Sequence, residues 1–355
     1  MIEALDVVGN PSSPHTEGRR ARAIVEDARE EVAALVGARP AEVVFTSGGT
    51  EANTAVLAGG WQTILLARIE HDSVLAPARE LARNGKARVV DLPVADSGDL
   101  RALAGHVPEA NGNRALLSLQ MANNETGVLQ PLAQAAAVAK AHGLSVHTDA
   151  VQAAGRIAVD FRALGVDFLS LSAHKLGGPK GIGALVIRDG AALPAFITGG
   201  GQERRRRAGT ENVPAIAGFG AAARAAGGSL AEMDRVRALR DRLEAEIRAI
   251  TPSAVVIAAA AERLPNTTNV ALPGASAETL VIALDLAGVA VSAGAACSSG
   301  KVGASRVLEA MGLEPGLARS AIRVSLGWGS TEADVAAFVA AWSQVAVRRR
   351  ERAVA

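Results

Sequence analysis

The fold is indicated most clearly by residues 166–178, which read VDFLSLSAHKLGG. The first six residues are nearly all apolar, which is typical of a strand that a parallel sheet buries on both faces. Lys175 follows the carboxyl end of this predicted strand, and open α/β sheets bind ligands outside that end. Gly177 and Gly178 allow a tight turn before the next apolar run, at 182–187. The position favours a functional lysine over a solvated surface lysine.

Apolar, strand-like runs alternate with helical patterns along the first half of the chain, an order typical of βαβ units. Helices are predicted between several of the strands, for example at 74–83 and 132–142. The predicted strands are residues 42–46, 63–67, 87–92, 115–119, 144–147, 167–171 and 182–187. The sequence therefore predicts an α/β fold with a mainly parallel seven-stranded sheet.

The C-terminal part predicts a second, smaller α/β domain. A charged amphipathic helix is expected from Leu230 to Ile250, ending before Pro252. The elements expected after it are strands at 254–257, 268–272 and 322–326, and helices at 277–286 and 332–347. We predict a large cofactor-binding domain of residues 12–245 and a small domain formed by residues 1–11 and 246–355.

The composition of the 355-residue chain excludes several functions. A formal net charge of +1 gives no sign of a nucleic-acid partner, because phosphate backbones require a concentrated basic surface. The N-terminus lacks the pattern of a signal peptide, and no uncharged apolar run reaches the ~18 residues of a membrane helix. We therefore expect a cytoplasmic protein with no membrane partner. The single cysteine, Cys297, excludes an internal disulfide and a multi-cysteine metal site, and no metal is expected.

Two further segments supply what a pyridoxal 5'-phosphate (PLP) site needs besides the Lys175 amine. The cofactor requires a carboxylate for its pyridine nitrogen and hydrogen-bond donors for its phosphate. Asp149, in residues 147–152 (HTDAVQ), provides the carboxylate. Residues 46–51 (TSGGTE) follow a predicted strand and begin a helix, where Gly49 permits close approach and Thr50 and free amides can hold a phosphate. The same segment could also be an ordinary turn and helix cap.

From residues 9–13 (GNPSS) to residues 323–327 (RVSLG), the chain resembles the cysteine desulfurases of the iron–sulfur-cluster and nitrogen-fixation type. These enzymes belong to the class V aminotransferase family, within the fold-type I PLP-dependent transferases. The resemblance covers nearly the whole chain. It implies a PLP enzyme with that fold.

The resemblance implies four roles around the cofactor ring. Lys175 forms the Schiff base and then transfers protons. Asp149 pairs with the pyridinium nitrogen, and Gln152 hydrogen-bonds the ring hydroxyl. His71, in residues 70–73 (EHDS), stacks on the ring and acts as an acid or base. Taken alone, His71 would be equally compatible with capping a helix.

The phosphate and substrate sites are implied in the same way. Thr50, Ser172 and His174 hold the phosphate, and Thr210 reaches the phosphate of the neighbouring subunit in a homodimer. Asn124, in residues 123–127 (NNETG), contacts the cofactor and, with Arg323, binds the substrate carboxylate. A planar guanidinium suits a carboxylate because it can bind both oxygens, whereas Asn124 alone could be a turn residue.

Cys297 lies in residues 292–300, which read SAGAACSSG. A lone cysteine is more often a buried small hydrophobe, but this Gly- and Ala-rich stretch has little bulk to bury and favours a mobile loop. We predict conversion of L-cysteine to L-alanine, with a persulfide on Cys297 that passes to an iron–sulfur scaffold or another acceptor protein. Another PLP-dependent aminotransferase or lyase, or an inactive N-terminally truncated homologue, remains an alternative.

Two departures from the family pattern give further expectations. Relatives carry a strand and an Ala-Thr-Thr segment before the position of Gly9, and its absence predicts reduced stability or activity. Relatives usually carry glycine at the position of Arg205, within the basic run 204–207. The extra charge there is compatible with a solvated loop or with a useful charge near a phosphate.

Overall fold

The computed structural model describes the whole chain except residues 102, 104, 108–111, 295–304 and 355. The chain divides into two compact units. The first unit consists of Met1–Leu92, Ala102–Met121 and Gln130–Leu230, and the second of Pro93–Arg101, Ala122–Leu129 and Ala231–Ala355. In the part of the chain that the structure describes, no helix has the length and apolar character needed to cross a membrane.

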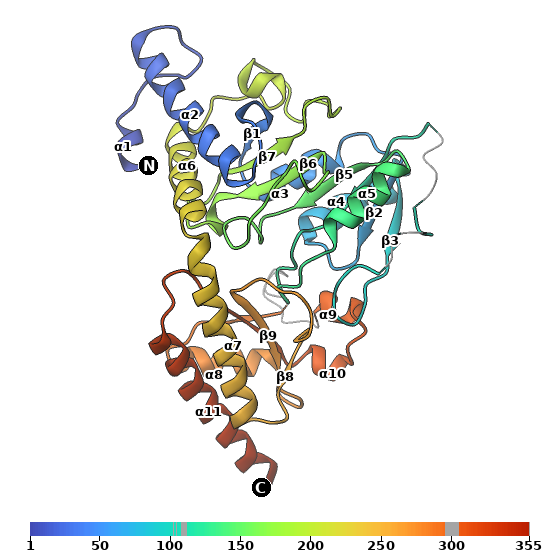
Figure 1. Ribbon diagram of the computed structural model, residues 1–355, viewed down its shortest axis with the longest axis vertical. Helices are drawn as coiled ribbons and strands as arrows, with labels where there is room; N and C mark the ends of the chain where they lie inside the picture. The colour runs from blue at the N-terminus through green and yellow to red at the C-terminus, as the bar shows by residue number, and fades with distance from the viewer. Residues whose placement is uncertain (102, 104, 108–111, 295–304, 355) are drawn as a thin grey trace. The chain divides into compact units, whose positions relative to one another are not determined.

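The first unit is built on a seven-stranded sheet with the order β1-β7-β6-β5-β4-β2-β3 (Figure 1). Its strands are β1 Val43–Thr46, β2 Thr63–Ala67, β3 Arg88–Leu92, β4 Ala115–Ser118, β5 Ser145–Asp149, β6 Phe168–Ser172 and β7 Gly183–Ile187. Only β7 runs antiparallel to its neighbours, β1 and β6. The mainly parallel α/β sheet predicted from the sequence is therefore confirmed, with strand ends that match or differ by at most two residues.

Burial explains why these segments form strands. Every residue of β1, β4, β6 and β7 is buried, as expected where helices cover both faces of a sheet. The edge strand β3 differs, because Arg88 and Asp91 are exposed. Charged side chains on an edge strand oppose pairing with another chain.

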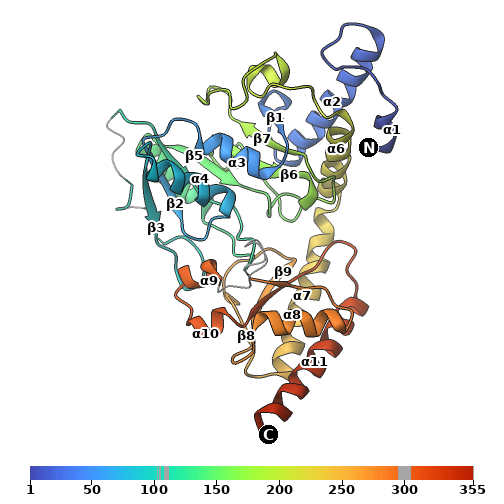
Figure 2. The same cartoon turned by 180° about the vertical axis from the view of Figure 1, so that it is seen from behind.

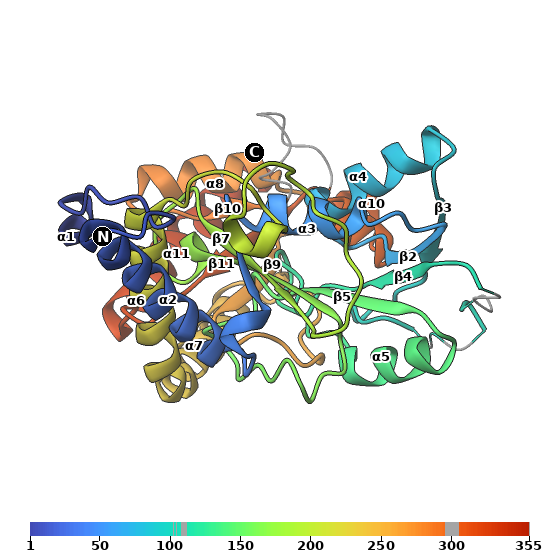
Figure 3. The same ribbon diagram turned by 90° about the horizontal axis from the view of Figure 1, so that it is seen from above.

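Helices cover both faces of this sheet (Figure 3). The helices are α1 Ile2–Leu5, α2 Thr16–Leu35, α3 Gly49–Leu57, α4 Asp72–Arg83, α5 Leu132–Ala141 and α6 Val213–Gly228, and the 3-10 turns are η1 Pro40–Glu42, η2 Ala173–Lys175 and η3 Gln202–Arg205. The turn η4 Leu230–Glu232 begins at the last residue of this unit and continues into the second. Apolar residues of α3 and α4 pack on one face, and α5 lies on the opposite face. Helices α2 and α6 approach so closely that a Cβ at Gly220 would lie 2.6 Å from Ala28 Cα.

The second unit contains a four-stranded antiparallel sheet with the order β10-β11-β9-β8. Its elements are β8 Val255–Val256, β9 Thr267–Ala271, β10 Ser292–Ala293, β11 Ala321–Ser325, α7 Met233–Ile250, α8 Ala277–Leu286, α9 Arg306–Ala310, α10 Pro315–Ala318 and α11 Glu332–Val354. Helices α7, α8 and α11 share one apolar core with the sheet (Figure 2). Phe338 and Trp342 of α11 stack within this core, with ring centroids 6.0 Å apart.

The observed units differ from the predicted division into residues 12–245 and residues 1–11 with 246–355. The N-terminal helix α1 contacts α6 of the first unit. The boundary near residue 230 precedes α7 because the apolar side chains of that helix, such as Leu239 and Leu243, pack in the core of the second unit. Two short segments, 93–101 and 122–129, also belong to the second unit.

Candidate active site

The predicted site residues of the first unit follow the carboxyl ends of its parallel strands. Asp149 is the last residue of β5, and Ser172 is the last residue of β6. Helix α3 begins three residues after β1 ends, and His71 lies four residues after β2. Because these strands run in one direction, their ends share one edge of the sheet, where open α/β sheets bind ligands.

Asp149 is a buried carboxylate with two hydrogen-bond donors among the described residues. Its Oδ1 atom accepts a hydrogen bond from the Val151 amide at 2.9 Å, and Oδ2 accepts one from Asn53 Nδ2 at 2.8 Å. Burial raises the pKa of Asp149, while these hydrogen bonds and the charges of His71 and Lys175 oppose the rise. A cationic partner would favour the ionised form further. The geometry suits a carboxylate that pairs with a pyridinium nitrogen.

Asn53 extends a hydrogen-bonded chain from Asp149 to His71. Its Nδ2 atom also donates to Ser73 Oγ at 2.9 Å, and that hydroxyl lies 2.8 Å from His71 Nδ1. His71 Nδ1 accepts from the Ser73 amide as well, at the N-terminus of α4. An Nδ1 atom that accepts this hydrogen bond leaves Nε2 as the ring atom that can carry a proton. The sequence prediction included His71 but missed Asn53 and Ser73.

Lys175 closes the short turn η2, three residues after Ser172. Ser172 Oγ lies 2.8 Å from His174 Nδ1, so these two predicted phosphate ligands are in contact. Burial, followed by the charge of Lys175, lowers the pKa of His174. A neutral His174 can donate or accept a hydrogen bond without adding charge to the site.

Arg156 connects the segment of Gln152 to that of Lys175. Its Nη1 atom donates to the Gln152 carbonyl at 2.7 Å, and Nη2 donates to the Lys175 carbonyl at 3.1 Å. One guanidinium thus holds together the segment that follows Asp149 and the turn that contains Lys175. This role was not predicted, because Arg156 lies outside the motifs that point to the site.

The N-terminus of α3 lies against the segment that follows Asp149. A Cβ atom at Gly49 would come within 2.9 Å of Val151 Cγ2 and 3.4 Å of Ser172 Cβ, so glycine permits the close approach. Thr50, in the first turn of the helix, is exposed. Free amides at a helix N-terminus bind anions, and this end of α3 lies beside Ser172.

Thr210 lies on a pocket of about 240 Å³ in the first unit. Ser47 and Arg207 also line this pocket. Arg207 binds Glu51 in the first turn of α3, with Nε–Oε1 and Nη2–Oε2 distances of 3.0 and 3.3 Å. The predicted inter-subunit phosphate ligand therefore lies on the same pocket as Ser47, two residues before α3 begins.

The two predicted carboxylate ligands, Asn124 and Arg323, belong to the second unit. Arg323, on β11, donates from Nη1 to the Asn124 carbonyl at 2.8 Å and from Nη2 to Ser292 Oγ at 3.2 Å. These contacts fix the plane of the guanidinium. Cys297 lies in residues 295–304, outside the described part of the chain.

The donor set of the first unit fits PLP. Asp149 would hold the pyridine nitrogen, and the amides of Gly49 and Thr50, with Ser172, would hold the phosphate. Lys175 follows the same edge of the sheet and would carry the Schiff base. PLP serves such enzymes as an electron sink.

Comparisons with known proteins identify the class. Residues 3–338 match the model of the aminotransferase class-V family, whose members include PLP-dependent enzymes. The chain is 41% identical over 341 residues to a protein named cysteine desulfurase from Sinorhizobium fredii, covering 93% of this chain and 87% of that protein. The chain therefore belongs to the class V aminotransferases and, within them, to the cysteine desulfurase family.

Solved structures support the same assignment. A NifS-like protein from Rickettsia africae superposes with a TM-score of 0.87 at 33% identity, covering 97% of this chain and 93% of that one. A structure described as SspA in complex with cysteine superposes with a TM-score of 0.77 at 31% identity, covering 92% of this chain and 94% of that one. The fold-type I expectation from the sequence is confirmed.

Proposed function

We propose that this protein is a PLP-dependent cysteine desulfurase that converts L-cysteine to L-alanine and carries the released sulfur as a persulfide on Cys297. The observation that carries the proposal is the buried Asp149 carboxylate, which accepts a hydrogen bond from Asn53. It lies at the same edge of the sheet as the turn that contains Lys175. Relatives named cysteine desulfurase support the choice of reaction. Cys297 is the only thiol in the sequence.

Lys175 acts first as the amine that holds the cofactor and then as the base that takes the α-proton of the substrate. When bound, PLP supplies the electron sink that makes this proton acidic. The Cys297 thiolate then attacks the substrate sulfur. The substrate Cβ–Sγ bond breaks as the bond between the two sulfur atoms forms, and protons returned to the three-carbon fragment complete L-alanine.

Arg323 is proposed to bind the substrate carboxylate. Its hydrogen bonds to the Asn124 carbonyl and Ser292 Oγ orient the guanidinium fork before substrate arrives. Asn124 is proposed as the second ligand of the carboxylate and as a cofactor contact. The related structure described as a complex with cysteine supports a cysteine substrate.

Three finer assignments belong to the proposal. Thr210 contacts the cofactor phosphate of a second subunit in a homodimer, and His71 stacks on the cofactor ring. The persulfide passes to an iron–sulfur scaffold or another acceptor protein. The cytoplasmic location expected from the N-terminal sequence stays a prediction.

The test supplies the purified protein with PLP, L-cysteine and a small thiol as sulfur acceptor, and measures alanine and sulfide. The wild type should form both in equal amounts. Lys175→Ala should form neither, and Cys297→Ser should lose sulfide release. Release of alanine from a different amino acid, without any reaction of L-cysteine, would favour another PLP-dependent reaction instead.

A further inference from the structure

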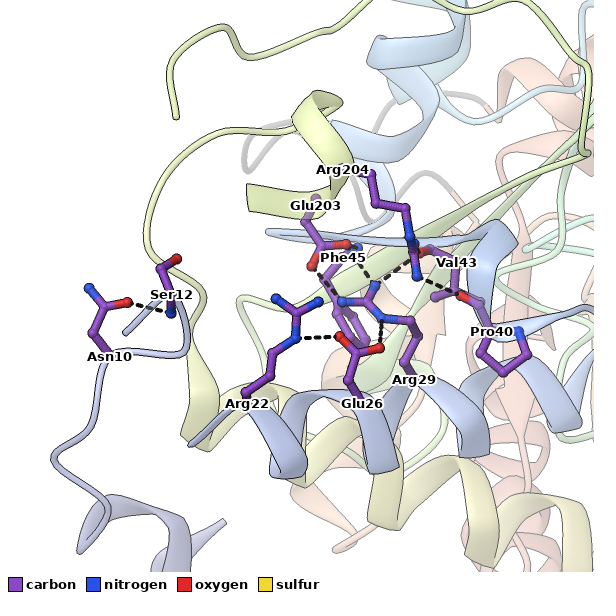
Figure 4. Close-up of polar contacts among 10 residues, drawn as sticks. All are labelled: Asn10, Ser12, Arg22, Glu26, Arg29, Pro40, Val43, Phe45, Glu203 and Arg204. Atoms are coloured by element: carbon purple, nitrogen blue, oxygen red, sulfur yellow. Dashed lines mark hydrogen bonds and ion pairs between the residues drawn. The ribbon is translucent and has the colours of Figure 1, made fainter. Parts of the chain in front are cut away.

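A buried ion pair joins α2 to the turn η3 in the first unit (Figure 4). Arg29 and Glu203 form a bidentate pair, with Nη1–Oε2 and Nη2–Oε1 distances of 2.8 Å, and their side chains are only 3% and 2% exposed. Glu203 Oε2 also accepts a hydrogen bond from the Phe45 amide at 2.8 Å. Arg29 Nη1 donates to the Val43 carbonyl at 2.9 Å. The pair therefore fixes η3 to β1.

The backbone that follows is held in an unfavourable conformation. Glu203, Arg204 and Arg205 have φ values of 43°, 56° and 64°, in the left-handed region that favours glycine. Among the described residues, only one other non-glycine residue, Ala258, has a positive φ. Three consecutive residues adopt this conformation only where surrounding contacts impose it. Glycine at position 205 would adopt it without strain.

The strained turn leads directly to the phosphate end of the cofactor site. Arg207 lies two residues beyond it and binds Glu51 in the first turn of α3. Glu51 Oε2 accepts a hydrogen bond from the Ser47 amide at 2.9 Å, just before that helix begins. Thr210 follows three residues later and lines the same pocket as Ser47 and Arg207. Glu203 is thus connected to the start of α3 by the short chain segment to Arg207 and by the contact of Arg207 with Glu51.

Burying two charges is an expensive way to stabilise a fold, because the loss of hydration offsets most of their attraction. The bidentate geometry instead gives one defined position of the turn. We infer that Arg29 and Glu203 are positioning residues for the phosphate end of the site: their ion pair holds the left-handed turn that places Arg207 on Glu51 and Thr210 on the shared pocket. The inference rests on the proposed function in two points: an anion held at the start of α3 is taken to be the phosphate of PLP, and Thr210 is taken to serve the phosphate of a second subunit.

The test titrates PLP and pyridoxal, which lacks the phosphate, into the full-length protein freed of cofactor, and follows the absorbance of the Schiff base. Glu203→Gln should weaken PLP binding roughly tenfold, the effect of one lost positioned hydrogen bond, and change pyridoxal binding less than about twofold. Glu26→Gln is the matched control. Glu26 also contacts Arg29, at 3.1 Å, but its side chain is 35% exposed, and its ion pairs in the described part of the chain are with Arg22 and Arg29 rather than with η3. This variant should bind both probes like the wild type.

Two further variants separate positioning from folding. Arg207→Gln breaks the link to Glu51 without removing a buried charge, and should reproduce the selective loss of PLP affinity. Adding Arg205→Gly to Glu203→Gln lowers the cost of the left-handed turn, and should restore part of that affinity.

Several results would overturn the inference. Equal losses of PLP and pyridoxal affinity in Arg207→Gln would assign the contacts a general structural role. A folded Glu203→Gln variant with unchanged PLP affinity, or a wild type that binds pyridoxal as tightly as PLP, would leave no positioning of a phosphate to explain. The desulfurase proposal is tested separately, since a wild type that prefers PLP but does not release sulfur from L-cysteine contradicts that proposal alone and supports the phosphate preference.

Discussion

His147 provides a stability prediction whose size can be worked out from the structure. The side chain is fully buried in β5, two residues before Asp149. Its Nδ1 atom lies 2.9 Å from Ser118 Oγ of β4, and Nε2 lies 3.0 Å from Ser170 Oγ of β6. The imidazole therefore connects three adjacent strands beneath the proposed cofactor site. Burial lowers its pKa from 6.5 to about 3.

The lowered pKa makes the fold less stable in mild acid. The unfolded chain takes up a proton on this imidazole below pH 6.5, whereas the folded chain does not until about pH 3. The contribution to the free energy of unfolding is therefore present above pH 6.5 and is lost as the pH falls toward 3. A pH of 5 lies about 1.5 units below the ordinary pKa of an imidazole. This difference corresponds to a loss of about 2 kcal/mol in the free energy of unfolding.

Denaturant unfolding at pH 7.5 and pH 5 measures this contribution by difference. His147→Gln keeps a polar side chain but cannot titrate, so its stability should fall by about 2 kcal/mol less than that of the wild type between the two pH values. His106→Gln is the control, because it removes an exposed imidazole from the same unit. It should show the full wild-type loss. An equal loss of stability in the wild type and in His147→Gln would contradict a buried, neutral His147.

Three further substitutions test individual contacts. Asn53→Ala removes a donor to a buried carboxylate and should lower the free energy of unfolding by about 2 kcal/mol in denaturant titrations; unchanged stability would contradict the hydrogen bond to Asp149. Burial, above all, raises the pKa of Glu70 well above its ordinary value. Its contribution to the free energy of unfolding is therefore fully present below about pH 4.5 and is lost as the pH rises through the pKa of the folded state. Glu70→Gln should therefore gain thermal stability over the wild type at pH 9 relative to pH 5, and identical pH profiles would contradict this. Arg323→Lys replaces a bidentate ligand with a point charge and should raise the KM for L-cysteine about tenfold, a result that an unchanged KM would exclude.

The sheet was predictable because its strands are short apolar runs separated by clear breaks. Buried parallel strands such as β6 are apolar on both faces, so they stand out from the amphipathic segments between them. Helix α2 was not among the predicted elements. Of the seven residues on its buried face only Val25 and Val32 are large and apolar, while Ala21, Ala28 and Ala33 are small, which gives a weak hydrophobic pattern. Close packing against α6, which the sequence alone does not reveal, stabilises that face.

Candidate site residues could be proposed from the sequence where they lie in short motifs, as for Asp149 and Lys175, and the structure places both at or just after the ends of strands of the same sheet. The residues that hold the site residues and the turn η3 in place were not predicted, since their contacts form only when distant segments meet. Asn53 and Asp149 are 96 residues apart, and Arg29 and Glu203 are 174 apart. In the sequence, Glu203 is one acidic residue before a basic run and is compatible with a solvated loop. Only the folded chain identifies it as the partner of a buried arginine.

The most direct test of the central claim is the mass of Cys297 after a single turnover. The protein loaded with PLP is mixed with one equivalent of L-cysteine, without an acceptor thiol, and the peptide that carries Cys297 is analysed after rapid quenching. The proposed mechanism predicts a gain of one sulfur atom on Cys297 in the wild type, with one alanine formed per persulfide, and no gain in Lys175→Ala. Alanine formation with an unmodified Cys297, or release of sulfur by Cys297→Ser to an added thiol at the wild-type rate, would contradict it.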